Sequence, residues 1–128
     1  MSASAFFLGI VGITLSLLPQ EVENYFDLPA GSSIVLQLGG ALYFGFAMLN
    51  WMAKGNLIGG IFSKPVAVGN FGHFFVAGLA LLKYTYRLPS ISYIAITALV
   101  IYLAFALLFG YVVFVNPVSN VNPASGKK

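Results

Sequence analysis

Charged side chains and cysteine are what this 128-residue sequence most lacks. Asp, Glu, Lys and Arg together make up 7% of the chain, and there is no cysteine. The missing cysteine excludes disulfides, cysteine-ligated zinc, iron–sulfur clusters and thiol redox chemistry. The six Lys and Arg residues form no basic run or stripe. The net charge of +3 therefore predicts no nucleic-acid partner.

Hydrophobic residues take the place of the missing charges. They make up 59% of the chain, whereas an average soluble domain has roughly 45–50%. A small domain leaves much of its surface exposed, so a chain of this size could not keep so much apolar surface away from water. The composition predicts a protein whose solvent is the lipid bilayer.

Four apolar segments are separated by short polar stretches, and a membrane-spanning helix needs roughly 20 residues. The predicted helices cover about residues 3–18, 33–53, 66–86 and 91–115. The first is short and stops at Pro19. A cleaved signal peptide is the alternative there, but no Lys or Arg precedes the segment and no A-x-A-like site follows it. The sequence therefore predicts an all-α fold, a single four-helix transmembrane bundle over residues 1–116, followed by a flexible polar tail over 117–128.

The scattered charges predict an orientation. With four spans, Lys54, Lys64, Lys127 and Lys128 share one side of the membrane with both termini, while Lys83 and Arg87 lie on the other. The positive-inside rule then places both termini in the cytoplasm.

All three acidic residues lie in the connection 19–32, at Glu21, Glu23 and Asp27. No base or nucleophile is near them in the sequence. They are better explained as a solvated face, or as a loop that docks a partner, than as an acid–base pair.

Polar side chains gather around the connection between the second and third segments. At about 100° per residue, Tyr43 and Asn50 share one face of the second helix, and Asn70, His73 and Tyr84 share one face of the third. An unpaired amide or imidazole is costly in hydrocarbon, so these groups are expected to converge between the two helices. The plainest interpretation is a structural staple. The alternatives are a small polar pocket or ion path with a titrating His73, and His73 as a ligand of haem or a metal.

Aromatic and basic residues at segment ends are typical of anchors at the membrane interface. These are Trp51, Lys54, Lys64, Lys83 and Arg87. Small residues also recur at four-residue spacing, in Ala5-x-x-x-Gly9, Gly12-x-x-x-Ser16 and Ala41-x-x-x-Gly45. Such spacing lets helix backbones approach closely.

The layout of four helices with a polar junction after the second resembles the DoxX-like group of small bacterial membrane proteins. The resemblance covers the layout of most of the chain and the stretch "LQLGGALYFGFAMLNWMAKGN". It implies an architecture only. The expected location is a bacterial inner membrane. No functional residue is carried over, because the Arg- and Gly-rich pattern of that group's first helix is absent here.

Three functions are compatible with these features. The favoured one is a non-catalytic accessory or assembly subunit that packs against a larger membrane complex, because no acidic residue lies inside any predicted span. The first alternative is a small oligomeric channel or transporter that uses Asn50, Asn70 and His73. The second is a membrane protein or enzyme that binds a lipid or quinone. The favoured hypothesis predicts no enzymatic activity, cofactor or metal. Its partners would be membrane lipids and another membrane protein or a second copy of the chain.

Overall fold

A computed structural model describes residues 1–55, 63–87 and 92–115 of the chain, and these residues are all-α, with no strand among them. The helices form two compact units, Met1–Gly55 and Asn56–Lys128. Each unit is described by itself.

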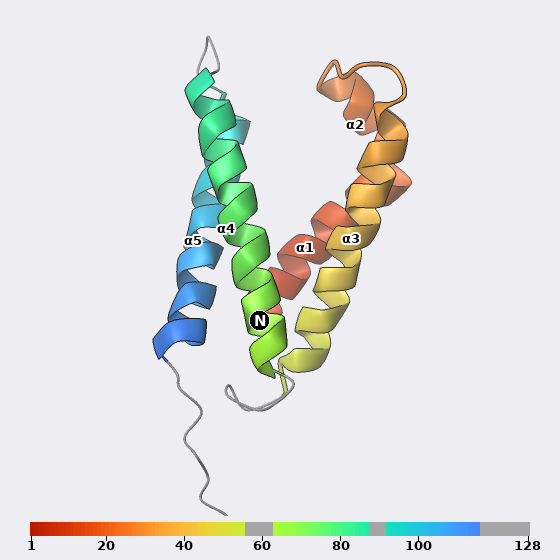
Figure 1. The fold of residues 1–128 in the computed structure, drawn as a ribbon. Coiled ribbons are helices and arrows are strands. Elements are labelled where there is room, and N and C mark those ends of the chain that lie inside the picture. Colours follow the sequence, from red (N-terminus) through yellow and green to blue (C-terminus); the bar gives the residue numbers. More distant parts are fainter. Residues whose placement is uncertain (56–62, 88–91, 116–128) are drawn as a thin grey trace, which may run out of the picture. The chain divides into compact units, whose positions relative to one another are not determined.

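The first unit holds three helices, α1 (Ser2–Leu17), α2 (Pro19–Tyr25) and α3 (Ser32–Ala53). Pro19 has no N–H to continue α1, but it suits the first turn of a new helix, so the chain ends one helix and begins another there. The axes of α1 and α2 differ by 91°. The prediction of a loop over 19–32 is therefore wrong for its first half, and α2 packs beside α3 instead (Figure 1).

Two glycines allow α1 and α3 to cross in backbone contact. A Cβ placed on Gly40 would lie 2.7 Å from Ser16 N and 2.8 Å from Gly12 O, and a Cβ on Gly12 would lie 2.7 Å from Phe44 N. These distances leave no room for a side chain at either position. The predicted role of Gly12-x-x-x-Ser16 is confirmed. A Cβ on Gly45 would meet no atom within 4 Å, so Gly45 is in no close contact among the described residues, and packing of Ala41-x-x-x-Gly45 against a partner stays a prediction.

The second unit is a hairpin of two long antiparallel helices, α4 (Ser63–Arg87) and α5 (Tyr93–Val115), which lie side by side in Figure 1. Helix α4 begins three residues before the predicted start at residue 66, because Pro65 is tolerated in the first turn of a helix. Helix α5 begins at Tyr93, and the predicted start at residue 91 lies outside the described residues.

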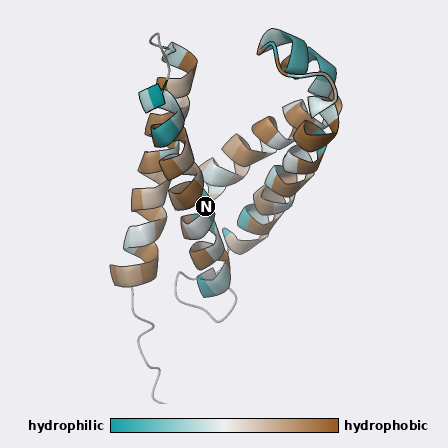
Figure 2. Cartoon of the chain, turned by 45° about the horizontal axis from the view of Figure 1, so that its top comes forward, coloured by the Kyte–Doolittle hydropathy of each residue, from teal (hydrophilic) through white to brown (hydrophobic). Residues whose placement is uncertain are grey.

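Three of these helices, α3, α4 and α5, are long and apolar enough to cross a membrane, and α1 with α2 would add a fourth if that bent pair makes one span. In Figure 2 the long helices are largely brown, whereas α2 is mostly teal. Helix α1 has 16 residues, which is about 24 Å of helix. That length is shorter than the roughly 30 Å hydrocarbon core of a bilayer.

Polar side chains within the apolar helices bond to their own backbone. Thr14 Oγ1 donates to Ile10 O at 2.9 Å, and Thr97 Oγ1 donates to Tyr93 O at 2.8 Å. Asn70 Nδ2 does the same to Val66 O at 2.8 Å. Each bond joins residue i to the carbonyl of i−4. A polar group in hydrocarbon has no water to bond with, so these internal bonds suit helices that lie in lipid.

Candidate functional site

The α3 half of the predicted polar cluster lies beside the face that packs on α1. Asn50 is fully buried and Tyr43 is half-buried. Ala47 faces α1, since a Cβ on Gly9 would lie 3.7 Å from Ala47 Cβ. Asn50 follows Ala47 by three residues, so it is turned about 60° around α3 from that contact.

The α4 half of the cluster is spread along its helix. Asn70 is fully buried and His73 is half-buried, whereas Tyr84 is 57% exposed. Eleven residues separate His73 from Tyr84, which corresponds to about 16 Å along a helix axis. The structure therefore places Asn70 and His73 one turn apart and Tyr84 near the far end of α4. The convergence of the α3 and α4 halves stays a prediction.

The core of the hairpin is a cluster of aromatic rings centred on Phe74, which is fully buried. The Phe74 ring stacks on Phe105 and Phe109, with centroid separations of 4.8 and 5.8 Å. Tyr102 meets Phe74 edge-on at 5.4 Å, and its ring centroid lies 5.9 Å from that of His73. The only histidine is thus next to a buried tyrosine of the most apolar helix.

The sequence did not single out Tyr102, because this tyrosine stands in an otherwise apolar run, where an aromatic residue is usually part of the hydrophobic core. A signal was present in the spacing. Phe71, Phe74 and Phe75 on one helix, and Tyr102 and Phe109 on the next, recur at three, four and seven residues, as expected for facing stripes of two adjacent helices. Two antiparallel helices with such stripes are expected to join them in one aromatic core.

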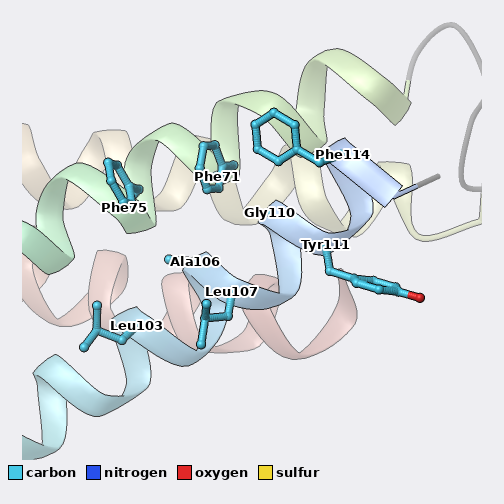
Figure 3. Close-up of a pocket in the computed structure, with 8 residues that line it drawn as sticks. All are labelled: Phe71, Phe75, Leu103, Ala106, Leu107, Gly110, Tyr111 and Phe114. Carbon is cyan, nitrogen blue, oxygen red and sulfur yellow. The ribbon is translucent and has the colours of Figure 1, made fainter. Parts of the chain in front are cut away.

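An apolar groove of about 350 Å³ lies between α4 and α5. Its walls come from both helices of the hairpin (Figure 3). The lining residues are Phe71, Phe75, Leu103, Ala106, Leu107, Gly110, Tyr111 and Phe114. Gly110 makes the hollow, because a Cβ there would come within 3.2 Å of the Phe71 ring. The Tyr111 hydroxyl is the one polar side-chain group of this lining.

Trp51 of α3 packs against α1. Its ring meets Phe6 of α1 edge-on, with centroids 5.5 Å apart, and Lys54 Nζ lies 2.8 Å from the centroid of the indole ring. A cation over the face of an indole is attracted by the ring's quadrupole. The predicted anchors Lys64, Lys83 and Arg87 are exposed near the two ends of α4. That these residues lie at a membrane interface stays a prediction.

The three acidic residues lie in α2 and the turn after it. Glu23 Oε1 accepts a hydrogen bond from Gly31 N at 3.2 Å, so this carboxylate holds the turn into α3. Glu21 and Asp27 are exposed. Asp27 has a φ of 49°, a left-handed conformation that Asp tolerates better than most residues. Docking of a partner here stays a prediction.

No group of three His, Asp or Glu residues lies close enough to hold a metal ion within the ranges 1–55, 63–87 and 92–115. The notable features of these ranges are instead two buried asparagines, one histidine beside a tyrosine, and an apolar groove. These features define a class: an all-α protein whose long apolar helices could cross a membrane several times. No family model, no curated protein and no solved structure matches the chain. The resemblance to the DoxX-like group stays a prediction.

Proposed function

We propose that this chain is a small multi-pass membrane protein that serves as a non-catalytic subunit of a larger membrane complex. The observation that carries the proposal is the surface of α5. This helix is apolar around its whole circumference, yet only 17% of its most apolar stretch is buried within the chain. Leu107, Leu108 and Phe114 are all more than 60% exposed. A helix with an apolar surface on every side must meet lipid or another protein on the sides that its own chain leaves uncovered.

The absence of acidic residues supports a subunit over a coupled transporter. Helices α1, α3, α4 and α5 contain no Asp or Glu. Proton- and ion-coupled transport commonly relies on an ionisable group in the membrane, and acidic side chains are frequent in that role. His73 is the ionisable side chain nearest the middle of its helix, and its ring is packed against Phe74 and Tyr102.

We also propose an arrangement of these helices in the membrane. Helix α1 counts as a thin fourth span, and α2 lies at the surface, since a bend of 91° directs it across the axis of α1. Four spans place both termini on one side. The excess of Lys at 54, 64, 127 and 128 favours the cytoplasmic side, in a bacterial inner membrane.

Gentle extraction of the tagged chain from its native membrane, followed by mass spectrometry of the co-eluting proteins, tests the proposal. We expect one larger membrane protein in stoichiometric amount. Ala104 is exposed on the side of α5 that lies opposite the α4-facing residues Tyr102 and Phe109. Ala104→Trp adds bulk there without entering the core and should lower recovery of the partner. A pure homo-oligomer with no partner would contradict the proposal.

A further inference from the structure

The groove between α4 and α5 runs along a helix that is long and apolar enough to span a membrane. Its α5 wall extends from Leu103 to Phe114, which is about 16 Å along the helix axis. One leaflet of the hydrocarbon core is about 15 Å thick, half of the roughly 30 Å total. The groove therefore has the length and the direction of one lipid acyl chain in one leaflet.

The ends of the groove differ in polarity. The inner end, at Leu103 and Phe75, has only apolar side chains. Tyr111 stands near the other end, four residues before α5 finishes at Val115. In Figure 3 the Tyr111 hydroxyl points away from the groove toward that end of the helix. Amphipathic rings in membrane proteins favour the headgroup level with their polar atom toward water. The polar end is thus where the ester and headgroup of a lipid would lie.

We propose that this groove holds one acyl chain of a phospholipid from the leaflet at which α5 ends. The Phe71 and Phe75 rings form one wall and Leu107 the other, and the Tyr111 hydroxyl meets the lipid's ester region. A partner helix fits less well, because a helix is 10–12 Å wide with its side chains and the hollow holds about 350 Å³. The inference rests on the chain lying in a bilayer, as proposed above, and is independent of its role as a subunit.

Because Leu107 is exposed, a substitution there can fill the groove and leave the core of the hairpin intact. Its side chain is 75% exposed, so Leu107→Trp should occupy the groove without disturbing the core. Leu108 is the matched control, because it is 62% exposed on the same helix and does not line the groove. The probe is a phosphatidylcholine with a diazirine in its acyl chain, mixed into vesicles that contain only the purified chain. Residue-level tandem mass spectrometry locates the cross-links.

We expect labelling at Phe71, Phe75 and Leu103 to exceed labelling at Val100, which is exposed but does not line the groove, by about threefold. The many weak contacts of a filled groove add together. Leu107→Trp should remove this excess, and Leu108→Trp should leave it unchanged. Even labelling of all exposed apolar residues would overturn the proposal. Cross-links between two copies of the chain at the groove, without lipid there, would overturn it as well. Absence of labelling on every helix would instead overturn the membrane location on which the inference rests.

Discussion

The contact between α1 and α3 gives the sharpest prediction, because it depends on a missing side chain. Gly40→Ala places a methyl group 2.5 Å from Ser16 Oγ, 2.7 Å from Ser16 N and 2.8 Å from Gly12 O. Ordinary carbon contacts are about 3.5–4.0 Å, so α1 has to move away by roughly 1 Å. Two of the three clashing atoms are backbone, so a change of rotamer cannot relieve the contact.

The expected cost follows from two opposing terms. Forcing extra volume into a closely packed contact costs about 1–3 kcal/mol. Alanine in place of glycine returns up to about 1 kcal/mol of helix propensity. We expect Gly40→Ala to lower the free energy of unfolding by about 1–2 kcal/mol on balance. Gly39→Ala is the matched control, because a Cβ at Gly39 meets nothing within 4 Å.

The assay is unfolding of the purified chain in mixed micelles with increasing dodecyl sulfate, followed by tryptophan fluorescence. Trp51 is the only tryptophan and it contacts Phe6 of α1, so its emission reports on this helix pair. Ser16→Gly in the Gly40→Ala background should restore little stability, since it removes Oγ and leaves both backbone clashes. Equal stability of the Gly40→Ala and Gly39→Ala variants would refute the close crossing of α1 and α3.

Three further predictions concern the hairpin and the arrangement in the membrane. Phe74→Ala removes a fully buried ring and should destabilise the hairpin by about 3 kcal/mol or more. Phe75→Ala, at a side chain that is 44% exposed, should cost clearly less, and a dodecyl sulfate titration followed by circular dichroism of the helices compares the two. His73→Phe should leave ion flux in proteoliposomes at the level of the original protein, because the proposed subunit does not transport ions. A flux that depends on His73 would favour a channel or transporter. The chain has no cysteine, so Ser2→Cys and Asn24→Cys can each be labelled with an impermeant maleimide in intact cells. We expect labelling of Asn24→Cys alone, because α1 separates the two positions. Equal labelling of both variants would show that α1 does not span the membrane.

The class of the protein followed from sequence because it depends on composition and length. Apolar runs of about 20 residues with few charges have few stable alternatives to helices in lipid, since every backbone polar group must bond within its own segment. The boundaries of α3 and α4 were accordingly predicted to within three residues. The close helix contact at Gly12-x-x-x-Ser16 could also be predicted, because such a contact needs small side chains at four-residue spacing.

The close contacts, the helix α2, the Tyr102 contact and the groove depended on which helix surfaces meet. The periodicity of the sequence alone does not predict which surfaces meet. Gly40 and Gly45 have the same chemistry, and only the position of α1 decides that the first is in backbone contact and the second is not. Helix α2 was missed because seven residues rich in acids look like a loop, and its helical state is supported by packing beside α3. Tyr102 and the groove were missed because an apolar helix shows the same pattern on its buried and exposed faces. The sequence by itself determined that this chain has several helices apolar enough to cross a membrane, since that follows from a sum over residues. Tertiary structure decided which ring lies beside His73 and where a hollow remains, since those depend on how two helices fit together.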